Sequence, residues 1–146
     1  MSTRANFYIK VDHEHYQQYY SHCDGYRAGL GEDLRKILVY SLGYQILTPS
    51  SKLQDIVNEV ISLDVREDNN GCGKYNREDI YSVTERNGLH ADIEYIYLID
   101  FNFQKGCSLY GKACWNTYHK ETVGEVVNDL CRAENLIDLR TMITKK

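Results

Sequence analysis

The beginning of the chain contains six side chains that can together hold an anionic ligand. They are Arg4, Tyr20, His22, Asp24, Tyr26 and Arg27. Arginine binds phosphate or carboxylate groups through paired hydrogen bonds, and tyrosine can stack on a base without a precisely placed acid or base. These residue types therefore predict a ligand-binding site for a nucleotide-like small molecule.

The backbone of the same stretch favours this interpretation. Asp24-Gly25 is typical of a tight turn, and Gly29 and Gly31 permit close approach where a helix is expected to begin at Leu30. The first N–H groups of a helix favour an anion. A purely structural explanation is also open, in which Arg4 pairs with Asp24 and fixes the first strand to the turn.

Two His-x-Asp pairs suggest an alternative function, a small hydrolase or nuclease. His22 and Asp24 form one pair, and His90 and Asp92 form the other. A histidine base oriented by a carboxylate is plausible chemistry. On a strand, however, this spacing places both side chains on one face, where a salt bridge is a sufficient explanation. A metal site would need all four residues to converge. We predict no catalytic residue, no metal ligand and no cofactor.

Other histidines and the cysteines are assigned no role in function. His13 and His15 form a His-x-His pair without an evident third ligand, so a solvated hairpin end explains them better than a metal. The five cysteines are odd in number and contain no C-x-x-C pair. Cys107 and Cys114 could face each other across a hairpin, but free thiols are expected, with neither zinc nor a disulfide needed for folding.

Composition predicts one cytoplasmic domain. The 146 residues carry a net charge of −4, which argues against binding to duplex nucleic acid. No apolar run approaches the ~20 residues of a membrane span, and the N-terminus does not resemble a signal peptide. Thirteen tyrosines suit either strands or an interface. Together with the apolar residues of 136–143, they predict a homo-oligomer, most simply a dimer.

Periodicity predicts a single α+β domain over residues 1–146, with about five mostly antiparallel strands packed on one face by two or three helices. The strands are expected over 7–11, 16–22, 80–84, 92–103 and 107–115. Helices are expected over 30–42, over 51–63 and after Thr122, where Glu125 completes a capping box. Residues 66–77 are expected to form a loop, and 136–143 a final helix or docking segment.

The opening of the chain resembles a loose group of small phage and prophage proteins. The similarity covers the run S-T-R-A-N at residues 2–6 and the pattern H-x-D-G-Y-x-x-G-x-G at residues 22–31, about a quarter of the chain. The sequence departs from the pattern at Arg27, where proline is common. The resemblance implies a viral or mobile-element origin and a role in the host cytoplasm against host defence. Such a protein would block a host defence protein or sequester a nucleotide-derived signal.

A third interpretation is a protein-binding inhibitor. An acidic, tyrosine-rich surface could cover a basic groove on another protein. The carboxylates are not concentrated in one run, since Glu32-Asp33 and Glu67-Asp68 are separate pairs. The sequence therefore favours a binding protein without catalysis, and it leaves open whether the partner is a small molecule or a protein.

Overall fold

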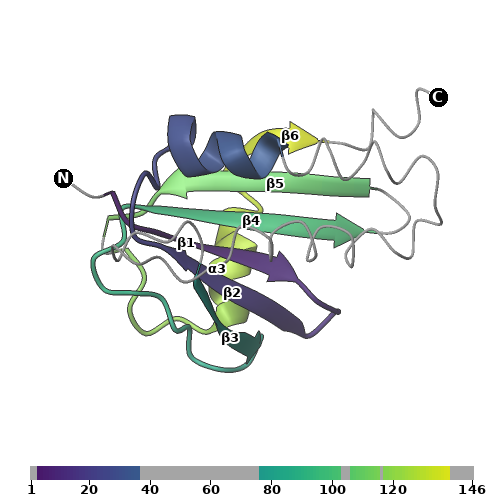
Figure 1. Ribbon diagram of the computed structural model, residues 1–146. Helices are drawn as coiled ribbons and strands as arrows, with labels where there is room; N and C mark the ends of the chain where they lie inside the picture. Colours follow the sequence, from purple (N-terminus) through teal and green to yellow (C-terminus); the bar gives the residue numbers. More distant parts are fainter. Residues whose placement is uncertain (1–2, 37–75, 103–105, 116, 139–146) are drawn as a thin grey trace.

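A computed structural model describes residues 3–36, 76–102, 106–115 and 117–138 of the chain (Figure 1). The chain forms β1 and β2, a short π-helix η1 that leads into helical residues 32–36, then β3, β4, β5, α3 and β6. Their bounds are β1 Ala5–Lys10, β2 His15–Ser21, η1 Arg27–Gly31, β3 Asn76–Ser82, β4 Tyr95–Asn102, β5 Gly106–Ala113, α3 Val123–Leu130 and β6 Glu134–Asp138.

The strands form one sheet in the order β3-β2-β1-β4-β5-β6. Every neighbouring pair is antiparallel except β1 and β4, which are parallel. The α+β class and the mostly antiparallel sheet are therefore confirmed. The described sheet has six strands because Glu134–Asp138 adds an edge strand. The segment 136–143 was expected to be helical or to dock elsewhere, and its first residues instead belong to β6. Residues 139–146 lie outside the described residues.

Helix α3 covers one face of the sheet. Tyr8, Ile96 and Leu98 point to this face and pack with the buried side of α3. The capping box at Thr122 and Glu125 is present as predicted. The apolar residues of this helix are buried at Val123, Val126, Val127 and Leu130. Cys131, just after the helix, is exposed.

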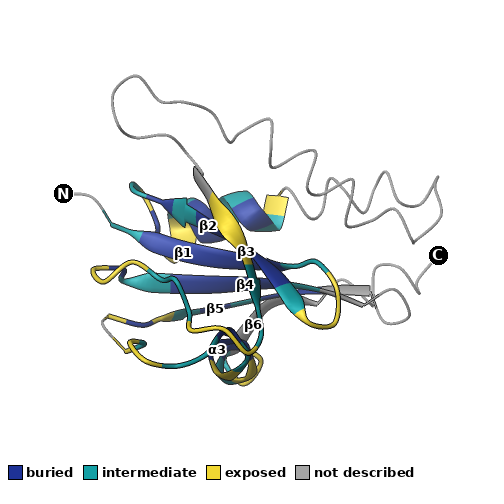
Figure 2. Ribbon diagram, turned by 90° about the horizontal axis from the view of Figure 1, so that it is seen from below, coloured by how far each residue is buried: buried dark blue, intermediate teal, exposed yellow. Residues whose placement is uncertain are grey.

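The helical segment 27–36 lies on the opposite face (Figures 1 and 2). Its Leu30 and Leu34 are buried, and a side chain at Gly31 would meet the Tyr97 ring at 3.3 Å. Because alternate residues of a strand point to opposite faces, Tyr97 and Ile99 lie here while Ile96 and Leu98 lie under α3. The two described helices thus cover different faces, and not one face as expected. Apolar residues on both faces suit a central strand, and β4 lies inside the sheet between β1 and β5.

Several expected elements lie outside the described residues. The helix expected over 30–42 is described only as far as residue 36, and neither the helix expected over 51–63 nor loop residues 66–75 are described. Residues 76 and 77 of the expected loop begin β3. Within the described residues, no helix is long and apolar enough to cross a membrane.

Most described tyrosines serve the core. Tyr8 and Tyr97 are fully buried, and Tyr19 is 2% exposed and stacks on Phe7 with ring centroids 4.9 Å apart. Among the described tyrosines, Tyr26 alone is classed as exposed. Tyrosine suits buried positions of a sheet when the rest of its ring can pack. For the described tyrosines, the sheet thus explains most positions, and these residues form no exposed tyrosine face.

Candidate functional site

The predicted site residues gather at one end of the sheet. Ser21, Ala5, Tyr95 and Ala113 are successive cross-strand partners, so β2 and β5 end where β1 and β4 begin (Figure 1). Arg4 precedes this line of residues, and His22 to Arg27 follow it. We call this the ligand end of the sheet and the opposite end, with the β1–β2 turn, the hairpin end.

The turn after β2 is built by contacts within the protein. Asp24 has a φ of 58°, in the left-handed region that aspartate tolerates better than most residues. The Asp24 carbonyl accepts a hydrogen bond from Leu30 N–H at 2.7 Å, and a side chain on Gly29 would overlap that carbonyl. Gly29 N–H donates to the Tyr26 carbonyl at 3.0 Å. The glycines therefore permit close approach of the chain to itself, and these N–H groups are used within the turn.

Tyr20 is the centre of a cluster on the α3 face. Its hydroxyl lies 2.9 Å from His22 Nδ1, and its ring stacks on His90 with centroids 3.8 Å apart. His90 Nε2 in turn lies 3.3 Å from Glu78 Oε1. Burial raises the pKa of Tyr20, and the nearby Arg4 charge only partly opposes this. The phenol therefore stays neutral near pH 7 and is poorly suited to act as a nucleophile.

The two His-x-Asp pairs have separate partners in the structure. Asp92 Oδ2 lies 3.3 Å from Arg4 Nη1, and the Tyr26 hydroxyl donates to Asp24 Oδ1 at 3.4 Å. Asp92 thus takes the place that the structural explanation gave to Asp24 as the partner of Arg4. Within the described part of the chain, no group of three or more His, Cys, Asp and Glu side chains could hold a metal ion.

A cleft of about 480 Å³ opens at the β5 edge of the ligand end. Arg27 at the start of η1, Lys112 on β5 and Arg132 just after α3 line it, together with Tyr95 and Asp129. We call it the basic cleft. Three cationic side chains against one carboxylate leave a formal charge of +2 in a chain whose net charge is −4.

Within the basic cleft, Asp129 is already engaged. It accepts hydrogen bonds from the Tyr118 hydroxyl and from Lys112 Nζ, the latter at 2.9 Å, and these bonds lower its pKa. The same contact with Asp129 raises the pKa of Lys112. Lys112 and Asp129 therefore pair with each other, and Arg27 and Arg132 are the other two cationic side chains of the lining.

Sequence reasoning found one basic residue of the cleft, Arg27, and missed Lys112 and Arg132. Those two belong to β5 and to the end of α3, and only the pairing of β5 with β4 brings them to the start of η1. No local motif marks them. The order of the strands was the missing information, because it decides which chain segments meet at an edge.

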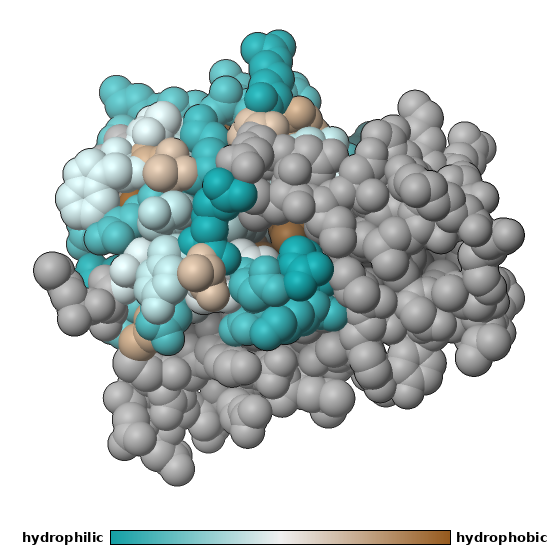
Figure 3. Space-filling model, turned by 90° about the horizontal axis from the view of Figure 1, so that it is seen from above, coloured by the Kyte–Doolittle hydropathy of each residue, from teal (hydrophilic) through white to brown (hydrophobic). Residues whose placement is uncertain are grey.

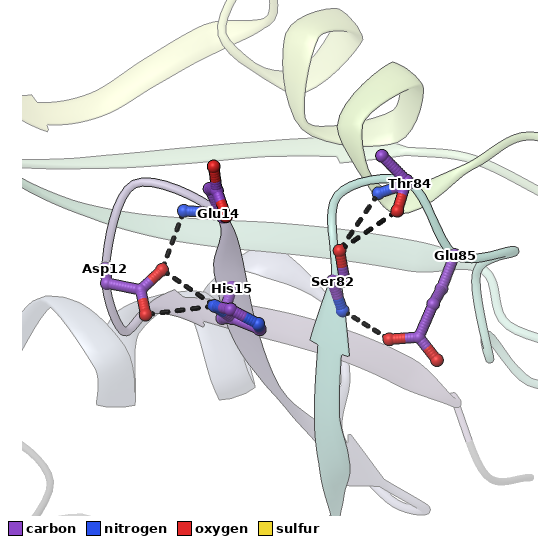
Figure 4. Close-up of polar contacts among 6 residues, drawn as sticks. All are labelled: Asp12, Glu14, His15, Ser82, Thr84 and Glu85. Carbon is purple, nitrogen blue, oxygen red and sulfur yellow. Dashed lines mark hydrogen bonds and ion pairs between the residues drawn. The ribbon is translucent and has the colours of Figure 1, made fainter.

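The histidines of the hairpin end are structural (Figure 4). His15 Nδ1 lies 2.9 Å from both oxygens of Asp12, and Glu14 N–H donates to Asp12 Oδ1 at 2.6 Å. His13 is exposed. The explanation as a solvated hairpin end therefore accounts for His13 and His15.

The expectation that all cysteines are free thiols is wrong for Cys23, which is disulfide-bonded. Cys114 and Cys131 are free, so the expected alternative of a Cys107–Cys114 bridge does not form. Burial raises the pKa of the Cys114 thiol to about 12, so it is not a reactive thiolate. An odd count and the absence of a C-x-x-C motif did not exclude one disulfide, because pairing depends on distances that the sequence does not contain.

Comparison of the chain with protein-family models, with curated proteins and with solved structures found no match.

Proposed function

We propose that this chain is a non-catalytic binding protein whose basic cleft holds an anionic, nucleotide-like ligand. The observation that supports it is the meeting of Arg27, Lys112 and Arg132, from three separate elements, around one opening. Ligand pockets typically enclose about 300–1,000 Å³. A cleft lined by one sign of charge concentrates ions of the opposite sign, here anions, even on a protein of negative net charge.

The arrangement favours binding over turnover. In the hydrolase or nuclease alternative, a His/Asp pair would supply the base. His22 is instead bonded to Tyr20, and Asp92 contacts Arg4. His90 does lie near a carboxylate, Glu78, but its ring is stacked on Tyr20. None of these four described side chains lines the basic cleft, where the ligand would lie.

The resemblance to small phage proteins extends the proposal to a biological role. In that role the protein acts in the host cytoplasm against a defence system. Of the two modes that the resemblance implies, the basic cleft supports sequestering a nucleotide-like signal better than blocking a host defence protein. A protein inhibitor would need a broad contact surface, whereas the charge here is concentrated around one opening.

The experiment is calorimetric titration of the protein with adenosine 5′-monophosphate. Arg27→Ala and Arg132→Ala should each weaken binding about 10- to 100-fold, because each removes a charged hydrogen-bond donor. Both side chains are exposed, so the melting temperature should stay within a few degrees.

Arg35→Ala is the matched control. Arg35 belongs to the same helical segment but is held by Glu32, with Nη2 2.6 Å from Oε1. The Arg35→Ala substitution removes one positive charge from the chain, as Arg27→Ala does, without changing the lining of the basic cleft. Unchanged binding in the Arg27→Ala/Arg132→Ala double variant, or an equal loss in Arg35→Ala, would contradict the proposal.

Self-association as a dimer remains part of the proposal. The described residues reduce the support for it, because four of the described tyrosines are buried, only Tyr26 is exposed, and Glu134–Asp138 pairs within the sheet. Light scattering at micromolar concentrations should give twice the mass of one chain. A constant monomer mass over the whole range would refute it.

A further inference from the structure

Two exposed aromatic side chains lie close in sequence to residues that line the basic cleft. Among the described residues, the large apolar side chains with high exposure are Trp115 at 64%, Tyr26 at 41% and Ile80 at 40%. Arg27 and Ala113 line the cleft. Tyr26 directly precedes Arg27, and Trp115 follows Ala113 by two positions. Two of these three exposed side chains are thus close in sequence to lining residues of one site.

Chain geometry keeps Trp115 close to the cleft. Two residues of a fully extended chain span at most about 7 Å, so the Cα atom of Trp115 lies within that distance of the Cα atom of Ala113. Trp115 is also the one tryptophan in the chain, at the position where exposure is highest among these side chains.

We propose that Trp115, with Tyr26, forms a stacking subsite for the base of a nucleotide whose phosphate lies in the basic cleft. This inference rests on the proposed function and adds the ligand class: a molecule with an aromatic base and a phosphate group. Stacking of a base on an aromatic ring is tolerant of base identity, because every base has a π-face. Arg27, which directly follows Tyr26 and lines the cleft, would contact the phosphate.

The surface around the cleft favours a small polar ligand over a protein partner. Stable protein interfaces bury about 800 Å² on each partner and have an apolar centre. Viewed onto the β5–β6 edge, the described surface is mainly hydrophilic, with small and separate apolar areas (Figure 3). Ile80 lies on β3, at the other edge of the sheet, so it cannot join Trp115 and Tyr26 in one patch.

The test uses Trp115 as its own reporter. Tryptophan fluorescence, excited where tyrosine does not absorb, is followed during titration with adenosine 5′-monophosphate, and calorimetry measures ribose 5-phosphate in parallel. The nucleotide should quench Trp115 in a saturable manner, and ribose 5-phosphate should bind more weakly. Trp115→Ala should weaken nucleotide binding about 5- to 150-fold, as expected for the loss of one stacked base, and leave ribose 5-phosphate unaffected.

Two further variants make the result specific. Trp115→Phe keeps an aromatic ring and should restore most of the nucleotide affinity. Ile80→Ala removes a comparably exposed side chain far from the cleft and should change nothing. If Trp115→Ala binds the nucleotide as tightly as the parent, or weakens ribose 5-phosphate equally, the stacking subsite is refuted.

The outcomes also separate this inference from the proposed function. If ribose 5-phosphate binding depends on Arg27 but the base adds no affinity, the anion site stands and the stacking subsite fails. If neither compound binds at millimolar concentration, both fail. If Trp115→Ala instead abolishes capture of a host protein while no nucleotide binds, the surface is a protein interface and the stacking subsite is likewise overturned.

Discussion

At the hairpin end of the sheet, the Asp12 and Ser82 hydrogen bonds join residues close in sequence, whereas at the ligand end the Arg4 and Tyr97 contacts join residues far apart. The Asp12 carboxylate contacts Glu14 and His15, two and three positions on, and Ser82 N–H donates to Glu85, three positions on (Figure 4). At the ligand end, Arg4 contacts Asp92 across 88 positions. The Tyr97 hydroxyl likewise donates to the Gly25 carbonyl across 72 positions.

The two kinds of contact have different roles: one closes a turn, and the other positions the elements that form the site. Contacts between near neighbours satisfy backbone N–H groups and close a turn, and they need nothing from the rest of the fold. Contacts across the sheet fix elements relative to one another. At the ligand end, residues of η1 and β5 and Arg132, just after α3, line one cleft. Residues from distant elements therefore meet there.

The largest expected effect comes from the packing that supports the ligand end. Leu34 is fully buried beneath the helical segment that carries Arg27. Leu34→Ala should lower the free energy of unfolding by ~2–5 kcal/mol, because it deletes buried methyl groups and leaves a cavity. Denaturant unfolding measures this loss. Lys36→Ala, at an exposed position of the same segment, should be nearly neutral.

A loss below half a kcal/mol in Leu34→Ala would show that this segment does not pack on the sheet as described. The ligand end would then lack a rigid support, and its contrast with the hairpin end would disappear. The helix expected over 51–63 lies outside the described residues and offers no corresponding test.

A smaller effect is expected from one buried hydrogen bond at the ligand end. The Tyr97 hydroxyl donates to the Gly25 carbonyl at 2.8 Å, and burial raises the pKa of this phenol. Tyr97→Phe leaves that carbonyl without its partner and should cost about 1–3 kcal/mol. Thermal and denaturant unfolding of the variant measure the cost.

Tyr8→Phe is the matched control for Tyr97→Phe. Both tyrosines are fully buried, but the Tyr8 hydroxyl has no hydrogen-bond partner within the described part of the chain. Its removal should be neutral or slightly stabilising, since a buried unpaired hydroxyl is unfavourable. Equal losses in the two variants would mean that ring packing, and not the bond to Gly25, anchors the turn.

The same contrast explains which features could be predicted from the sequence. The capping box at Thr122 and Glu125 was predictable because its residues lie on one helical turn. The β1–β2 hairpin was predictable from alternation and a short connection. The parallel pairing of β1 with β4 was not, because its contacts join distant segments and compete with many other pairings.

The candidate site was predictable only in part for the same reason. A single stretch supplied Arg27 and Tyr26, which flank or line the basic cleft. Other residues of that stretch contact each other and do not line the cleft, as Tyr20 does with His22. Lys112 and Arg132 have ordinary sequence surroundings, and their role follows from the strand order β4-β5-β6 and from the position of α3. Composition also could not indicate that the described helices cover opposite faces.

The smallest expected effect concerns the hairpin end and depends on pH. Hydrogen bonds from Glu14 N–H and then from the His15 side chain lower the pKa of Asp12 below its ordinary value of 3.8. Because the folded-state pKa is lower than the unfolded one, this carboxylate contributes stability at neutral pH. The contribution is lost as the pH falls below about 4 and through the folded-state pKa.

Asp12→Asn should therefore lower the melting temperature by only about one or two degrees at pH 7, because the site is exposed. The difference from the parent should vanish in acid, where Asp12 is protonated. His15→Ala should retain most of the pH dependence, since the Glu14 N–H bond is the larger cause of the shift. A difference that grows as the pH falls, or one as large as that of Leu34→Ala, would show that the hairpin end is more than a locally closed turn.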